Sequence, residues 1–369
     1  MSTIGWTEHG TSFSAHWHSE NATPAPRNVI AVDDRITANA ARRLAREGTG
    51  MVWRGDFHNA RQLLKAMERR LRQRPVGSDP TALFHSQRAA RAERAELLGR
   101  LLILVESDHS VALRRAPDTR QACDHAYRPA TGHPICVSLP VLLGVLSAHE
   151  WYRKGVEVPA LNARIHPDYG VFAPIRGEYV DLVAETPLPT GQPRVFDLGT
   201  GTGVLAAVLA SRGARVVATD VNERAVACAR ANLHRLGLAD RARVVAADLW
   251  PDGRADVVVC NPPWLPGQPT SALERGIYDP GSDMLHRFLD GLADHLTQAG
   301  EGWLVLSDLA ERLGLRTRTE LRDRMTAAGL RVAGRHDTSP RHPRAADTTD
   351  PLHDARRSEV TSLWRLVRS

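Results

Sequence analysis

Apolar and polar positions follow two patterns along this chain, and the change falls near residue 155. From residue 156 onward, short apolar runs alternate with segments whose apolar residues recur at helical spacing. That alternation is typical of βαβ units, in which parallel strands form a sheet with helices on both faces. It predicts a doubly wound α/β domain over residues 156–369, with strands in RVFDL (194–198), ARVVATD (214–220), ARVVAAD (242–248), ADVVVCN (255–261) and GWLVLSD (302–308).

The first part of the chain has mainly helical spacing, so residues 31–155 predict a mainly helical domain. Asp33 and Asp34 are candidate N-caps for a first helix that Gly48 ends. Further helices are expected over 56–75, 84–105 and 138–155. Residues 1–30 are rich in Ser, Thr, His and Pro, which predicts a poorly ordered tail.

Composition excludes several classes of protein. The 369 residues are 42% hydrophobic and 24% charged, as in ordinary globular chains. No apolar run approaches the roughly 20 residues of a membrane span, so no membrane partner is expected. The four cysteines share no metal-like spacing, which predicts no metal site and fits a reducing cytoplasm.

The basic balance of the chain allows two interpretations. The net charge is +6, and since only Lys65 and Lys154 are lysines, 46 of the 48 basic residues are arginines (48 − 2). Between Arg35 and Arg100, 15 basic side chains stand against 6 acidic ones. These arginines either cover solvated helix faces or form a surface that guides a polyanion. The second interpretation makes residues 31–155 a substrate-recognition domain.

A glycine-rich turn follows the first strand of the α/β domain. It places Asp197, Gly199, Gly201 and Gly203 at alternate positions, and Asp220 ends the next strand. Glycines let backbone amides approach a ligand closely, and the helix N-terminus that follows attracts negative groups. An acid at the end of the second strand can accept both hydroxyls of a ribose. Together these features predict a nucleotide-type cofactor site.

The spacing of this turn indicates which cofactor binds. Dinucleotide sites favour G-x-G-x-x-G, whereas this chain has G-x-G-x-G after a carboxylate that would repel a pyrophosphate. The Asp197 carboxylate suits a ligand that carries an ammonium and a sulfonium, so S-adenosylmethionine is predicted. Asp248, at the end of the third strand, is expected to accept from the adenine amino group while the Leu249 amide donates to the ring.

Four motifs in this order and spacing resemble the class I S-adenosylmethionine-dependent methyltransferases, in their small-domain branch: DLGTGTG (197–203), TDVNERAV (219–226), AADLW (246–250) and NPPW (261–264). The resemblance covers roughly residues 165–369. It implies a seven-stranded Rossmann-like sheet that ends in an antiparallel hairpin, for which LRVAGRHDT (330–338) and SEVTSLWRLVRS (358–369) supply the strands. It also implies that Phe172 lies near the methionine part of the cofactor.

The stretch Asn261-Pro262-Pro263-Trp264 suits the chemistry of a planar amine. The lone pair of such an amine is delocalised and has to turn toward the methyl carbon. The Asn261 side-chain oxygen and the Pro262 carbonyl can accept its two N–H bonds, and the prolines fix φ so that both acceptors are placed in advance. Trp264 is expected to offer a flat face for stacking. Catalysis would then rest on orientation and proximity.

The small-domain branch includes release-factor glutamine methyltransferases and enzymes that act on guanine N2 or adenine N6. We therefore predict an N-methyltransferase, and the arginine-rich first part favours an RNA base as the acceptor. A protein glutamine is the runner-up, and a small-molecule amine comes third. A non-catalytic binding module is the alternative from another class, against which the intact Asn261 argues.

Overall fold

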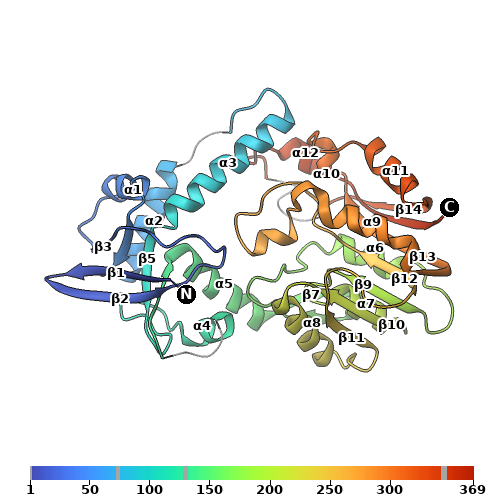
Figure 1. Ribbon diagram of the computed structural model, residues 1–369, viewed down its shortest axis with the longest axis horizontal. Helices are drawn as coiled ribbons and strands as arrows, with labels where there is room; N and C mark the ends of the chain where they lie inside the picture. The colour runs from blue at the N-terminus through green and yellow to red at the C-terminus, as the bar shows by residue number, and fades with distance from the viewer. Residues whose placement is uncertain (1, 72–74, 128–131, 342–346) are drawn as a thin grey trace. The chain divides into compact units, whose positions relative to one another are not determined.

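The computed structural model describes residues 2–71, 75–127, 132–341 and 347–369 (Figure 1). The chain divides into two compact units. Unit 1 comprises Met1–Val76 and His85–Glu150, and unit 2 comprises Gly77–Phe84 and Trp151–Ser369. None of the helices in the described parts of the chain is both long enough and apolar enough to span a membrane.

Unit 1 is built on a six-stranded mixed sheet of order β1-β2-β6-β5-β4-β3. In this sheet β3, β4 and β5 run parallel to one another, and β1 and β2 form an antiparallel hairpin. The strands are β1 (Thr3–Glu8), β2 (Thr11–Trp17), β3 (Val29–Val32), β4 (Gly50–Trp53), β5 (Leu101–Val105) and β6 (Ile135–Ser138). The helices that contain unit 1 residues are α1 (Ala38–Arg46), α2 (Phe57–Leu71), α3 (Pro80–Leu98), α4 (Arg120–Tyr127) and α5 (Leu139–Lys154).

Residues 1–30 do not form the poorly ordered tail that their composition predicts. The strands β1 and β2 pair in register, with Ile4 and Trp6 buried on one face. Their two-residue connection, His9-Gly10, has positive φ values of 49° and 83°. Positive φ at both positions matches the right-handed twist of a hairpin. The alternation of Ile4 and Trp6 was the signal for a strand, and the surrounding polar residues concealed it.

The prediction of a mainly helical domain over residues 31–155 misses a sheet, because β4, β5 and β6 lie within this range and β3 overlaps its start. The expected helix over 84–105 ends at Leu98, and Leu101–Val105 forms β5 instead. Five consecutive apolar residues suit a central strand that is buried on both faces. The first helix begins at Ala38 with Thr37 as its N-cap, four residues after Asp33. Helices α2 and α5 lie where the periodicity predicts them.

Unit 2 contains the predicted doubly wound sheet. Its seven strands have the order β11-β10-β9-β12-β13-β15-β14, and the last two form an antiparallel pair. This confirms the fold class and the seven-stranded sheet that the resemblance implies. The strands are β9 (Arg194–Leu198), β10 (Arg215–Asp220), β11 (Ala242–Ala246), β12 (Ala255–Cys260), β13 (Leu296–Ser307), β14 (Leu330–Thr338) and β15 (Thr361–Arg368). A separate small pair precedes them, β7 (Val156–Val158) and β8 (Ala163–Ile165).

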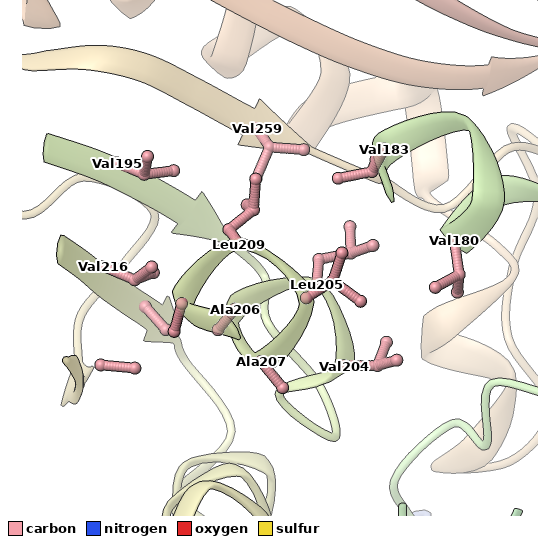
Figure 2. Packing of buried hydrophobic residues seen from close by; sticks show 14 of the residues in the cluster. Val180, Val183, Val195, Val204, Leu205, Ala206, Ala207, Leu209, Val216 and Val259 are labelled. Atoms are coloured by element: carbon pink, nitrogen blue, oxygen red, sulfur yellow. The ribbon is translucent and has the colours of Figure 1, made fainter. Parts of the chain in front are cut away.

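Helices cover both faces of the seven-stranded sheet. One face packs against α6 (Glu178–Glu185), α7 (Val204–Ser211) and α8 (Glu223–Arg235), and the other packs against α9 (Asp283–His295) and α11 (Arg318–Ala327). Figure 2 shows Val195, Val216 and Val259 of three strands beside α7, with Leu209 among them. The remaining helical segments are η1 (Pro159–Leu161), η2 (Leu273–Gly276), η3 (Pro280–Ser282), α10 (Leu309–Arg312) and α12 (His353–Arg357).

Leu209→Ala tests the packing of α7 on the sheet. Leu209 is fully buried, so the substitution leaves a cavity and should lower the free energy of unfolding by about 2–5 kcal/mol. Chemical denaturation measures the change. Leu273→Ala is the matched control, since Leu273 is 46% exposed and its loss should cost no more than about 0.5 kcal/mol. Equal effects of the two substitutions would contradict the assigned core.

Candidate active site

The register of the parallel strands brings the predicted motifs to one edge of the sheet. Leu198, the last residue of β9, pairs with Thr219 of β10 on one side and with Cys260 of β12 on the other. Gly199, Asp220 and Asn261 each come directly after one of these three residues. The glycine-rich loop, the strand-end acid and the NPPW turn are therefore neighbours, as the sequence predicts.

The glycine-rich loop requires glycine at each of its three positions. Gly199, Gly201 and Gly203 have φ values of 69°, 54° and 79°, in the region that L side chains rarely adopt. A Cβ at Gly203 would also lie 3.0 Å from the Cβ of Ala229 in α8. A Cβ at Gly201 would meet no atom within 4 Å, so the middle of the loop faces open space that a ligand can fill.

Asp197 lies beneath this loop, with 1% of its surface exposed. Its Oδ2 accepts hydrogen bonds from the Thr200 hydroxyl at 2.6 Å and from the Ala206 amide at 3.0 Å. Gly203, the N-cap of α7, has no side chain to satisfy the first amides of the helix, and Asp197 satisfies one of them. Burial raises the pKa of Asp197 to about 6. The sequence suggested a direct contact with a cationic ligand, but the structure gives Asp197 the task of shaping the loop.

Asp220 and Thr219 hold the loop from the neighbouring strand. Asp220 Oδ2 accepts from the Gly201 amide at 3.0 Å, and its Oδ1 accepts from the Asn222 amide at 2.9 Å. Burial raises the pKa of Asp220. The Thr219 carbonyl accepts from the Thr200 amide, and the Thr219 hydroxyl donates to the Leu249 carbonyl at 2.6 Å. Sequence reasoning missed Thr219, although its place directly before the strand-end acid was a signal.

Asp248 and Leu249 have other partners than those expected. The Asp248 carboxylate pairs with Arg287 at 2.9 Å, and 70% of its side chain is exposed. The Leu249 amide donates to the Ala247 carbonyl at 3.1 Å, and Leu249 has a positive φ of 77°. The Leu249 amide would have to leave the Ala247 carbonyl to donate to an adenine, whereas the exposed Asp248 carboxylate has a second oxygen that can accept beside its pair with Arg287. The adenine contacts assigned to both residues stay predictions.

The NPPW turn has an internal hydrogen bond. The Trp264 indole Nε1 donates to the Asn261 Oδ1 at 2.8 Å. No donor among the described residues is hydrogen-bonded to the Pro262 carbonyl. The indole ring packs against hydrophobic clusters on both faces of the sheet. Trp264, which was expected to offer a flat face for stacking, is therefore partly buried.

Arg176 lies over the Trp264 ring, with its Cζ 4.6 Å from the ring centroid. Two buried carboxylates hold the guanidinium: Glu178 accepts from Nε at 3.0 Å, and Glu359 accepts from a terminal nitrogen at 2.8 Å. Only 1% of the Glu178 side chain and none of the Glu359 side chain is exposed. Glu359 precedes β15, nearly a hundred residues after Trp264. No spacing in the sequence indicated this cluster.

Phe172 packs on the loop that follows the NPPW turn. A Cβ at Gly276 would lie 2.9 Å from the Phe172 Cβ, so glycine permits their close approach. The expected place of Phe172 near the methionine part of the cofactor stays a prediction. Within the described ranges, no group of three or more His, Cys, Asp or Glu side chains is arranged to hold a metal ion.

Asp197→Asn provides a pH test of the buried carboxylate. An asparagine oxygen can still accept from Thr200 and Ala206. In the wild type the folded pKa of about 6 lies above the ordinary value of 3.8, so the stability contributed by this group is present below pH 4 and is lost as pH rises through 6. The asparagine does not titrate. Between pH 4 and pH 7 the free energy of unfolding of the wild type should therefore fall by about 2–3 kcal/mol relative to that of Asp197→Asn. Denaturation without cofactor measures it, and a difference independent of pH would refute the assignment.

Comparison with known proteins agrees with this geometry. Residues 163–312 match the family described as Methyltransferase small domain. The release factor glutamine methyltransferase of Bradyrhizobium diazoefficiens is 29% identical over 218 residues, which cover 55% of this chain and 68% of that protein. The tRNA1(Val) (adenine(37)-N6)-methyltransferase of Bacteroides thetaiotaomicron is 34% identical over 133 residues, covering 33% of this chain and 56% of that protein.

A third relative is similar over a shorter stretch. Ribosomal RNA small subunit methyltransferase C of Cronobacter sakazakii is 41% identical over 95 residues, which cover 25% of this chain and 27% of that protein. The chain spans from about a quarter to about two thirds of the length of these three relatives. The resemblance that the motifs suggested is confirmed: residues 163–312 match the Methyltransferase small domain family, and all three relatives are named as methyltransferases.

Proposed function

We propose that this protein transfers the methyl group of S-adenosylmethionine to a planar exocyclic or amide nitrogen, most favourably on an RNA base at adenine N6 or guanine N2. The observation that carries this proposal is the position of Asn261 and Pro262. Two hydrogen-bond acceptors follow β12 directly, beside the glycine-rich loop that follows the paired strand β9. Such acceptors suit a nitrogen that carries N–H bonds.

The residues at this edge fit the cofactor. Gly201 leaves open space above the loop, and Asp220 stands at the strand end where a carboxylate can accept from ribose hydroxyls. Val221, the next residue, is apolar and yet 73% exposed. We assign it to contact with the adenine ring, which would cover this exposed surface. Sequence reasoning missed Val221, because the functional signal is its exposure.

Bound S-adenosylmethionine supplies a methyl group on a sulfonium, which becomes a neutral thioether when the methyl leaves. The protein holds the acceptor nitrogen in line with that bond. Asn261 and Pro262 accept hydrogen bonds from its N–H groups and so turn its lone pair toward the methyl carbon. The nitrogen becomes acidic as the new bond forms and releases its proton to solvent. The contribution of the protein is therefore mainly orientation and proximity.

A cationic stripe on α2 favours RNA as the acceptor. Arg61, Lys65 and Arg69 are spaced four residues apart, so they share one face of the helix. All three are exposed, and none has an acidic partner within the described residues. The opposite face of α2 is buried, so the stripe is fixed in place. We name these three residues the α2 stripe and propose that it binds phosphates.

A protein glutamine is the second candidate for the methyl acceptor, and a small-molecule amine is the third. A protein glutamine presents the same planar amide, and one relative bears the name of a release factor glutamine methyltransferase. A small-molecule amine would leave the α2 stripe without a role. A non-catalytic binding module would need neither Asn261 nor the rigid turn that holds it.

Asn261→Ala should leave the affinity for S-adenosylmethionine near the wild-type value and lower methyl transfer by roughly a hundredfold, by analogy with the loss of one polar group aimed at a transition state. The assay incubates the protein with labelled methyl donor and with separate RNA, ribosome, protein and metabolite fractions from source cells that lack it. Asp220→Ala is the counterpart, and should weaken cofactor binding in calorimetry by about 1.5–3 kcal/mol. Full activity of Asn261→Ala, or tight binding of NAD in place of S-adenosylmethionine, would overturn the proposal.

Charge reversal of the α2 stripe, with Arg61, Lys65 and Arg69 each changed to Glu, should weaken RNA binding without changing cofactor affinity. For each phosphate that the variant no longer neutralises, the slope of log affinity against log salt should fall by about 1. The control reverses three exposed arginines of unit 2, Arg243, Arg322 and Arg331. Arg70, beside the stripe, is unsuitable because it bonds to Asn39, and Arg72 lies outside the described residues. Binding that is flat between low and moderate salt would favour the protein glutamine.

A further inference from the structure

The hydrogen bond between Trp264 and Asn261 joins two side chains whose backbone is already constrained. Pro262 and Pro263 lie between them and fix φ at two successive positions. The indole ring packs against the hydrophobic clusters on the two faces of the seven-stranded sheet, so the N–H group has a fixed position. The bond of 2.8 Å therefore acts on the more mobile partner, the Asn261 carboxamide.

We propose that Trp264 is a positioning residue that selects the orientation of the Asn261 carboxamide, and that the acceptor does not stack on the ring face that Arg176 covers. The inference rests on the proposed function, in which Asn261 Oδ1 accepts an N–H bond of the acceptor nitrogen. It replaces the stacking role that the sequence suggests for Trp264.

The chemistry of the two groups explains the selection. A carboxamide can rotate by half a turn, which exchanges its oxygen acceptor for its NH₂ donor. The indole N–H can only donate, so it stabilises the orientation that presents Oδ1 and disfavours the one that presents the NH₂ group. The oxygen has two lone pairs, and one remains for the acceptor's N–H bond. The rotated amide would turn its NH₂ group toward the N–H group of the methyl acceptor, and the two donors would repel each other.

Arg176 reinforces this arrangement from the ring face. Its guanidinium lies 4.6 Å from the ring centroid and bonds to two buried carboxylates, Glu178 and Glu359. Glu359 also accepts from the Ser307 hydroxyl at 2.7 Å. A cation held by two carboxylates does not leave easily. A planar acceptor therefore cannot reach the covered face of Trp264, while the edge that carries the N–H stays directed at Asn261.

Nuclear magnetic resonance tests the hydrogen bond between Trp264 and Asn261 without any methyl-accepting substrate. The chain has 8 tryptophans, and Trp264→Phe identifies the indole resonance of Trp264 by its loss from the ¹⁵N-labelled protein. Asn261→Leu removes the acceptor oxygen, so that resonance should shift and its hydrogen exchange should accelerate roughly tenfold. Asn261→Asp keeps an acceptor oxygen and should retain slow exchange. Unchanged exchange in Asn261→Leu would overturn the proposal.

Kinetics test the role of the bond, with the cellular fraction that the wild type labels as acceptor. Trp264→Phe keeps an aromatic face but has no donor. It should lower kcat at least roughly tenfold while changing the KM for the acceptor by less than about threefold, since the lost interaction orients and does not bind. Full kcat in Trp264→Phe, or a loss confined to KM, would show stacking and overturn the proposal.

The two measurements separate this inference from the proposed function. A wild-type protein that labels no fraction refutes the proposed function, and the exchange of the Trp264 indole then still decides whether the bond exists. Thermal unfolding of Trp264→Phe, together with the unchanged resonances of the other tryptophans, shows that the variant folds. Cofactor affinity, measured by calorimetry, should equal that of the wild type. The indole contacts the amide of Asn261, and in the proposed function that amide binds the methyl acceptor and not the cofactor.

Discussion

The parallel register of β9 with its two neighbours is the constraint on which the rest of unit 2 depends. Leu198 pairs with Thr219 and with Cys260, and the glycine-rich loop, Asp220 and the NPPW turn each follow one of these three positions. Because parallel strands end at the same edge of a sheet, three motifs distant in sequence become adjacent there. A slip of one residue would turn the side chains of a strand to the opposite face of the sheet.

Buried carboxylates hold the loops of this edge in shape. Asp197 satisfies the start of α7, while Glu178 and Glu359 hold Arg176 against Trp264. An isolated buried charge is costly, and these carboxylates are tolerated because each accepts hydrogen bonds from fixed donors. The same bonds make the loops rigid before a ligand arrives. Rigid placement is what a reaction limited by orientation requires.

Unit 1 differs from the helical domain that its periodicity suggested, yet its charge pattern keeps the meaning considered from the sequence. The apolar face of α2 is buried, and α2 packs against α1. The α2 stripe therefore presents its charges from a fixed helix, so little conformational entropy of the backbone is lost on binding.

The sequence by itself determined the fold of unit 2, because hydrophobic periodicity and motif spacing are both properties of residues that are close together in the chain. The alternation of apolar runs and helices, the G-x-G-x-G turn and the position of Asp220 are local features, and each predicted its element correctly. The hairpin of β1 and β2 and the strand β5 were missed, since a short polar strand and a wholly apolar one lack a clear period.

Only the tertiary structure decided which partners each site residue has. Asp197 turned out to lie under its loop, Asp248 pairs with Arg287, and Trp264 points its N–H at Asn261 beneath Arg176. Hydrogen bonds and stacking depend on distances between atoms, and those distances are set by packing between segments far apart in the chain.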